Sequence, residues 1–271
     1  MDHLHLLRRL DRYLDTVPRT AAGTADAGPL RAFLSRAPWP YYARPRPELD
    51  LAGDGSITVA DVEAAAQLLV DHGSEVSFEW VHELVPSFAA TLETAGYAVT
   101  LHPLLALEVP EPLPPTPHAV LLAAGDPRFR DALAVAEIAF AAAGTAIGEQ
   151  GVEARDATVM PDGQLEHLAG RVADGSAAMV AVVDPVDGVV ASGSHVPVDG
   201  VTEVMGVATL PTHRRRGLAA EVVARLLVDA DERGCRLALL SAADDDVARV
   251  YERLGFARVG HAGAAIPLPR G

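Results

Sequence analysis

The sequence predicts an α/β or α+β fold, in which helices flank a mixed and mostly antiparallel sheet. Apolar runs rich in β-branched residues alternate along the chain with segments whose apolar residues recur at helical spacing. The expected strands 179–183 and 189–195 are separated by Asp187-Gly188, a dipeptide favoured in tight hairpins. With 271 residues, of which 49% are apolar, the chain can form one large or two medium domains.

Composition limits the classes of function that the chain can have. The formal net charge of −15 argues against a nucleic-acid-binding protein. Cys235 is the single cysteine, so no internal disulfide can form, and a reducing cytoplasm fits this composition. No stretch approaches the ~20 apolar residues of a membrane-spanning helix, and the charged N-terminus does not resemble a secretory signal. We therefore expect a cytoplasmic protein with no nucleic-acid or membrane partner.

The first half of the chain is expected to hold two helix–strand pairs after an N-terminal amphipathic helix. Leucines at helical spacing predict that first helix at 4–14, and the Gly-, Ala- and Pro-rich segment 18–30 is expected to be a loop. The two pairs are expected as a helix at 62–69, a strand at 76–81, a helix at 86–96 and a strand at 98–108.

The segment from Asp50 to Asp61 partly matches a calcium-binding EF-hand loop. Ala52, however, occupies a ligand position, and Asp61 stands where a longer, bidentate Glu is required. We favour the alternative that Thr58 caps a helix and Asp61 completes a capping-box-like start.

Five prolines between Val109 and Pro117 predict a stiff, extended connector. We therefore expect an N-terminal domain at 1–108, a linker at 109–117 and a second domain at 118–271. The second domain is expected to contain strands at 119–123, 179–183, 189–195, 201–210, 235–241 and about 257–266, helices at 126–142, 165–173, 218–233 and 245–254, and an irregular segment at 144–163.

The most informative stretch joins the strand 201–210 to the helix that Gly234 ends. Between them lies the basic run 214–217, Arg-Arg-Arg-Gly. The first N–H groups of a helix lack intrahelical partners and carry partial positive charge. Gly217 lets a ligand approach the backbone, and the arginines add fork-shaped donors suited to phosphate oxygens. This arrangement predicts a pyrophosphate-binding turn, with a solvated basic turn as the alternative.

Two motifs resemble the GCN5-related N-acetyltransferase (GNAT) family. Arg214-x-x-Gly217-x-Ala219 is similar to the family's acyl-CoA-binding motif, and Ala248 to Phe256 is similar to its A-x-x-x-Y-x-x-x-G-F signature. The resemblance implies a GNAT fold over 118–271 and, loosely, over 30–108, with acetyl-CoA as acyl donor and no metal. It implies coenzyme contacts at Val207, Thr209, Arg214, Arg215, Arg216, Gly217, Leu218, Ala219 and Asp245. Family members often carry Asn at this last position, so the carboxylate could instead cap the helix.

The first half of the chain repeats part of this pattern. Glu93 to Tyr97 parallels Glu252 to Phe256, each closing a helix that follows a strand. The first half therefore resembles a degenerate, partial copy of the GNAT fold. It has no RxxGxA motif before its helix, so we do not expect it to bind coenzyme A.

Acyl transfer from a thioester to an amine requires a base, because a lysine-like amine titrates near 10.4. Glu203, on the strand before the basic turn, resembles the base-bearing glutamate of histone-acetyltransferase-type members, and Tyr251 resembles the tyrosine near the coenzyme sulfur. The alternatives are a solvent-facing carboxylate for Glu203 and a packed aromatic residue for Tyr251. His195 and Asp199 are second-choice residues for the acceptor site.

We predict an acetyl-CoA-dependent N-acetyltransferase acting on a primary amine of an unidentified small molecule or peptide. Glu203 would be the general base and Tyr251 the general acid. A non-catalytic acyl-CoA sensor or scaffold is the alternative from another class, and it would need neither residue. A nucleotide-binding protein is a third interpretation, but the G-x-x-x-x-G-K-[ST] pattern is missing. The sequence leaves a homodimer open.

Overall fold

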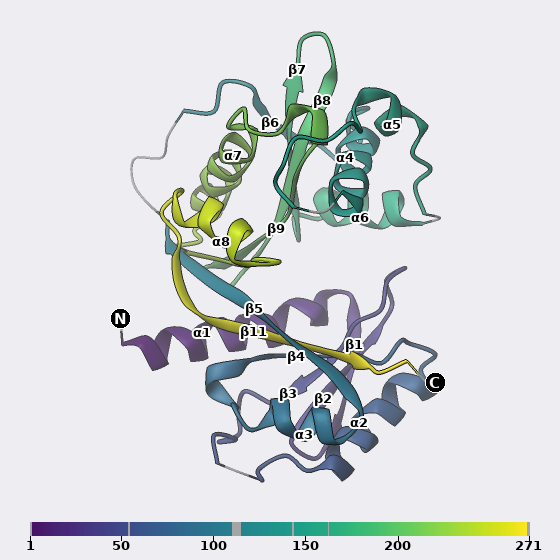
Figure 1. The fold of residues 1–271 in the computed structure, drawn as a ribbon, viewed down its shortest axis with the longest axis vertical. Helices are drawn as coiled ribbons and strands as arrows, with labels where there is room; N and C mark the ends of the chain where they lie inside the picture. Colours follow the sequence, from purple (N-terminus) through teal and green to yellow (C-terminus); the bar gives the residue numbers. More distant parts are fainter. Residues whose placement is uncertain (1, 54, 110–114, 143, 162, 270–271) are drawn as a thin grey trace. The chain divides into compact units, whose positions relative to one another are not determined.

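The structure is a computed structural model that describes residues 2–53, 55–109, 115–142, 144–161 and 163–269. The chain forms two compact units, each assembled from separate stretches. The first comprises residues 1–105, 241–248 and 257–271, and the second comprises 106–240 and 249–256. Figure 1 traces the chain through both.

The first unit is a sheet with helices. Its strand order is β1-β2-β3-β4-β11-β5, with β3 and β4 parallel and β4 and β11 antiparallel. Its elements are α1 (His3–Thr16), η1 (Val17–Thr20), β1 (Ala22–Ala27), β2 (Leu30–Ser35), β3 (Ala43–Pro45), α2 (Val59–Asp71), β4 (Phe78–Val81), η2 (His82–Leu84), α3 (Phe88–Thr94), most of β5 (Tyr97–Glu108), and β11 (Ala257–Pro267).

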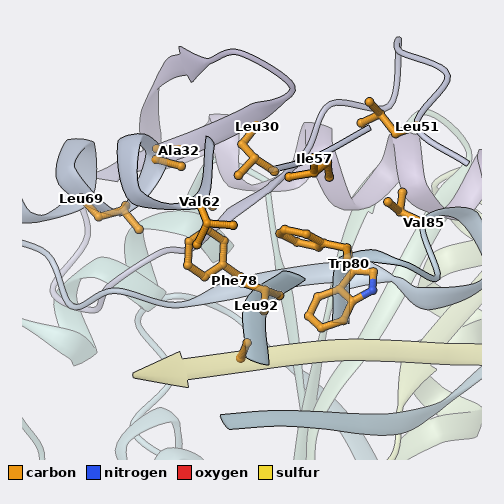
Figure 2. Close-up of a cluster of buried hydrophobic side chains, with 14 residues drawn as sticks. Leu30, Ala32, Leu51, Ile57, Val62, Leu69, Phe78, Trp80, Val85 and Leu92 are labelled. Carbon is orange, nitrogen blue, oxygen red and sulfur yellow. The ribbon is translucent and has the colours of Figure 1, made fainter. Parts of the chain in front are cut away.

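One face of this sheet carries an apolar core. Phe78 and Trp80 project from β4 onto Phe88 of α3, with edge-to-face ring contacts at centroid distances of 6.0 and 5.2 Å. Val62 and Leu69 of α2 close the same cluster (Figure 2). This burial of large side chains explains why two short helices and a four-residue strand form one compact unit.

Helix α2 begins as predicted. The Thr58 hydroxyl accepts from the Asp61 amide at 3.3 Å, and the Asp61 carboxylate accepts from the Thr58 amide at 2.8 Å. These reciprocal bonds are a capping box. Asp61 therefore completes a capping box with Thr58, which is the alternative that we favoured over the calcium loop. Asp54 of the calcium-loop pattern lies outside the described residues.

The segment 18–30 is not the loop that the sequence predicts. It contains β1, which pairs antiparallel with β2 from Ala22↔Ser35 to Ala27↔Leu30, and Gly28 makes the turn with φ of +56°. Small residues concealed the strand, because β1 owes its stability to pairing with β2 rather than to its own side chains. The other predicted elements of this half are confirmed to within a few residues.

The second unit has the strand order β10-β9-β8-β7-β6, with β9 and β10 parallel and the other pairs antiparallel. Its elements are β6 (Ala119–Leu122), α4 (Phe129–Ala141), α5 (Val152–Ala157), α6 (Gln164–Ala173), β7 (Ala178–Asp184), β8 (Gly188–Val198), β9 (Val201–Thr209), η3 (Pro211–His213), α7 (Leu218–Glu232), β10 (Leu237–Ser241) and the second half of α8 (Asp245–Glu252). The short helix α5 lies in the segment 144–163 that the sequence predicts to be irregular.

Helices α4 and α7 cover opposite faces of this sheet (Figure 1). The Ser192 hydroxyl of β8 donates to the Ala132 carbonyl of α4 at 2.6 Å. The next residue, Gly193, faces α7 so closely that a Cβ atom there would lie 2.7 Å from Val222 Cγ1. Because successive strand residues point to opposite faces, these two contacts assign the helices to their sides.

The predicted fold class, helices around a mixed and mostly antiparallel sheet, is confirmed. The strand expected to end the second domain is β11, which pairs with β4 in the first unit through Val81↔Ala262 and Phe78↔Ala265. The boundary predicted at the linker 109–117 stays a prediction, and residues 110–114 of it lie outside the described residues.

Candidate active site

A β-bulge interrupts strand β9 before its end. Ser192 of β8 pairs with Ala208 and Ser194 pairs with Met205, so Gly206 and Val207 together oppose the single residue Gly193. Gly206 has φ of +64°, which a glycine adopts at little cost. The bulge bends β9 at the residues that lead into the basic turn.

The edge of β9 that faces β10 loses its partner just before the bulge. The register between β9 and β10 runs from Val201↔Leu237 to Glu203↔Leu239 and ends there, although β9 continues to Thr209. Within the described part of the chain, no paired residue of β10 follows Glu203 along this edge. Backbone groups of residues 204–209 on that side can therefore hydrogen-bond an extended ligand as a strand would.

The basic turn adopts an unusual backbone. Arg215 has φ of +65°, a left-handed conformation that is uncommon for a residue other than glycine, and Gly217 follows with φ of +79° as the N-cap of α7. The N-cap residue Gly217 has no side chain with which to cap the helix, and the Ala220 and Glu221 amides bond back to the Gly217 carbonyl. The Leu218 and Ala219 amides precede these bonds at the positive end of the 15-residue helix.

The Arg214 guanidinium bonds backbone carbonyls at and after the end of α4. Its Nη2 donates to the carbonyls of Ala139 and Ala142, and its Nη1 donates to the carbonyl of Ala146, each at 3.0 Å. Burial lowers the pKa of Arg214. Arg215 and Arg216, by contrast, are exposed. The predicted phosphate contact of the Arg214 side chain therefore stays a prediction, and three of its five N–H donors are already used.

His213 holds the start of the turn through two side-chain hydrogen bonds. Its Nε2 donates to the Asp187 carboxylate at 3.0 Å, and its Nδ1 accepts from the Thr212 hydroxyl at 2.8 Å. Asp187 lies in the β7–β8 turn, whose carbonyl groups at Asp187 and Val189 accept from buried Arg155 at 2.6 and 2.7 Å. The turn is thus held to the rigid end of a hairpin.

Glu203 lies on the sheet face opposite α7. Its neighbour Thr202 bonds His195, which bonds Asp229 of α7, so Thr202 faces α7. Because side chains alternate between the two faces along a strand, Glu203 points to the opposite face. The residue is half-buried, in register with Val196 of β8 and Leu239 of β10. It is therefore the last residue of β9 before the strand loses its β10 partner.

Tyr251 lies near the C-terminal end of α8. Its ring contacts Phe256 edge to face at a centroid distance of 6.0 Å. The helix closes around it, because the Phe256 amide donates to the Tyr251 carbonyl at 3.1 Å while Gly255 takes φ of +98°. Burial raises the pKa of Tyr251 to about 12, so this phenol keeps its proton at neutral pH.

Comparison with known proteins points to the family that the sequence motifs resemble. Residues 152–256 match the model of the acetyltransferase (GNAT) family. The chain contains a GNAT domain. The matched residues include Glu203, the whole basic turn and Tyr251.

Solved structures resemble the chain over most of its length. A GCN5-related N-acetyltransferase from Kribbella flavida is 27% identical, with a TM-score of 0.70 over 98% of this chain and 96% of that one. A tandem GNAT protein of the clavulanic acid biosynthesis pathway is 18% identical, with a TM-score of 0.54 over 89% and 79% of the two chains. None of the curated proteins compared with the chain matches it in sequence.

Asp245 lies on the same helix as Tyr251. It is the first residue of α8 and accepts from Arg258 at 2.8 Å, both within the first unit. The helix cap is Asp244, whose carboxylate accepts from the Val247 amide at 2.8 Å. The predicted coenzyme contact of Asp245 stays a prediction.

His195 is not available to an acceptor, contrary to our second-choice prediction. The residue is fully buried in the GNAT domain, where Nε2 donates to the Asp229 carboxylate at 2.8 Å and Nδ1 accepts from the Thr202 hydroxyl at 2.7 Å. Arg233 Nε donates to the same carboxylate at 2.5 Å. Asp199, the other second choice, lies in the two-residue turn between β8 and β9 with φ of 49°.

Sequence reasoning missed two features of this site. The bulge at Gly206 had a signal, because an isolated glycine inside a strand pattern indicates a bulge or a close approach. The contact of His213 with Asp187 had none, since it joins residues from separate turns. Among the described residues, no group of three or more His, Cys, Asp or Glu side chains could hold a metal ion, and no helix is long and apolar enough to cross a membrane.

Proposed function

We propose that the GNAT domain transfers the acetyl group of acetyl-CoA to a primary amine. The observation that carries this proposal is the open edge of β9, which leads through the basic turn to the glycine N-cap of α7. An extended pantetheine chain with a diphosphate at its end matches such a combination, because strand-like hydrogen bonds and an anion-binding helix start follow each other.

In this proposal the backbone of residues 204–209, with Val207 and Thr209, binds the pantetheine amides. The amides of Gly217, Leu218 and Ala219 bind the diphosphate, and exposed Arg215 and Arg216 add charge. The left-handed conformation of Arg215 supports this role, because strained backbone outside glycine concentrates at ligand-binding sites.

The chemistry would be direct attack of the amine on the thioester carbonyl. Glu203 would take a proton from the ammonium form of the acceptor, directly or through water, so that the nitrogen can form the new C–N bond. The tetrahedral intermediate would lose its second nitrogen proton to water as the C–S bond breaks. The Tyr251 hydroxyl would supply the proton that the departing thiolate takes up, and water would then return a proton to the phenolate. The products are an amide and free coenzyme A.

A thiol-release assay over a panel of primary amines tests the proposal, with Glu203→Gln as the variant. We expect the variant to lower kcat/KM by about 10²–10⁴-fold near neutral pH, the usual contribution of general base catalysis. The loss should shrink toward the pKa of the amine, where the acceptor is already neutral.

A non-catalytic acyl-CoA sensor is the competing function. It would bind acetyl-CoA but release no thiol with any amine, and Glu203→Gln would then leave its only measurable property, coenzyme affinity, unchanged.

The buried single thiol, Cys235, is consistent with the reducing cytoplasm that we propose as the location.

A further inference from the structure

The Arg214 guanidinium joins the end of α4 and the segment after it to the basic turn. The last carbonyls of a helix have no intrahelical donor. Here the carbonyls of Ala139 and Ala142 at the end of α4, and that of Ala146 in the following loop, converge on Arg214 at 3.0 Å each. Charge-assisted bonds of this kind are about twice as strong as neutral ones.

Backbone bonds continue the same junction. The Gly148 amide donates to the Pro211 carbonyl at 3.1 Å, and the Thr212 amide donates to the Gln150 carbonyl at 3.2 Å. A Cβ atom at Gly148 would lie 2.9 Å from Pro211 Cβ, and one at Gly151 would lie 2.9 Å from Thr212 Oγ1. The loop therefore rests directly on the turn, with no room for an intervening side chain.

We propose that Arg214 is a positioning residue, which couples coenzyme binding at the turn to the order of residues 139–142 and 144–151. The inference rests on the proposed function, since it requires a ligand on the Leu218 and Ala219 amides. That ligand would hold the turn in its left-handed conformation at Arg215, one residue after Arg214, and the guanidinium would carry this restraint to the three carbonyls. By thermodynamic reciprocity, an ordered loop would in turn favour coenzyme binding.

The coupled segment is placed to matter for the acceptor. It displays two large apolar side chains, Phe140 and Ile147, which are 67% and 64% exposed. Each is next in sequence to a residue whose carbonyl Arg214 holds, so both project from one small region of the domain that carries Glu203. Coenzyme binding would therefore fix an apolar surface before the amine arrives.

Hydrogen exchange of the full-length protein, with and without saturating acetyl-CoA, tests the coupling. In the wild type, coenzyme should slow exchange of the amides in residues 139–142 and 144–151. In Arg214→Lys the charge remains, but an ammonium cannot span three carbonyls, so this coenzyme-dependent protection should be lost while the calorimetric Kd changes by less than about tenfold.

Two further variants keep the test sharp. Gly148→Ala should lose the same protection with Arg214 intact, because the new methyl group pushes the loop from Pro211. Arg130→Lys is the matched control, since Arg130 also bonds three carbonyls, those of Arg155, Asp156 and Thr158, none of which belongs to the segment that Arg214 holds. It should keep the protection of residues 139–142 and 144–151.

The outcomes separate the two proposals. Full coenzyme-dependent protection in Arg214→Lys would overturn the coupling, as would a large loss of affinity with protection unchanged at saturation, which would make Arg214 a direct phosphate ligand. If the wild type binds no acetyl-CoA by calorimetry, the proposed function falls and the coupling falls with it.

Discussion

At the scale of single residues, Tyr251 is a buried phenol that is protonated near neutral pH. Burial raises its pKa to about 12, and its ring contacts Phe256. The protonated hydroxyl can donate a hydrogen bond to a sulfur atom that becomes negative.

Tyr251→Phe should therefore lower kcat by about 10²–10⁴-fold, the range for a lost acid catalyst, while the Kd for acetyl-CoA stays nearly unchanged. The ring contact with Phe256 survives in the variant, so packing is retained. Steady-state kinetics and calorimetry on the same preparation measure both quantities. Equal turnover in the two proteins would remove Tyr251 from the mechanism.

Asp229 is the residue on which the buried network of the GNAT domain depends. Burial alone would raise its pKa, but hydrogen bonds from His195 and Arg233 outweigh burial and hold the pKa of Asp229 below its ordinary value. A lowered pKa in the folded state means that the ionised form stabilises the fold. This stability is fully present above the unfolded pKa and is lost as pH falls through the folded pKa.

Asp229→Asn should reduce the free energy of unfolding at pH 7 by about 1.5–3 kcal/mol, as for hydrogen bonds to a charged group. The difference from the wild type should shrink once the pH falls below about 4, where the unfolded carboxyl protonates. Urea unfolding followed by circular dichroism measures it. Asp231 lies on the same helix as Asp229 but is more exposed, and it pairs with Arg236. Asp231→Asn should therefore reduce the free energy of unfolding by under about 1 kcal/mol. Equal losses in both variants would contradict this account.

At the scale of elements, the bulge in β9 depends on one glycine. Gly206 has φ of +64°, and the nearest atom to a Cβ there is Ser194 Oγ at 3.7 Å, an ordinary contact. An added methyl group would therefore fit without a clash, but the backbone conformation would be unfavourable.

Gly206→Ala should destabilise the protein by about 1–2 kcal/mol, the cost of a left-handed residue with a Cβ. Gly170→Ala in α6 is the matched control, because its methyl group meets nothing within 4 Å and helix propensity there should favour alanine. Thermal unfolding of both variants gives the comparison. A neutral or stabilising effect at Gly206 would show that the bulge can be rebuilt without the glycine.

The elements themselves were largely predictable from local patterns. The apolar periodicity of α7 and the Gly234 that ends it are properties of adjacent residues, and so is the capping box at Thr58. The strand β1 was not predictable in this way, since small residues form it only against β2. At the candidate site, the sequence predicted the anion-binding turn, but it could not show that the Arg214 guanidinium points back to α4, because that contact joins residues about seventy positions apart.

At the scale of the whole molecule, the chain returns to its first unit at the end. Strand β11 pairs with β4, so neither unit is a single continuous stretch of sequence. Proline density predicts where a connector lies, but no local pattern reports a pairing between Val81 and Ala262. The candidate residues Glu203, Tyr251 and the turn 214–219 nevertheless all lie in the second unit, as the motifs predict.

The central claim is that the start of α7 binds the diphosphate of acetyl-CoA. Backbone amide resonances of the full-length protein, followed during titration with acetyl-CoA, test it most directly. We expect the amides of Gly217, Leu218 and Ala219 to shift and saturate at one equivalent, because hydrogen bonds to phosphate oxygens change their environment. Saturable shifts confined to other parts of the chain, or no shifts at all, would contradict the assignment of this turn as the coenzyme site.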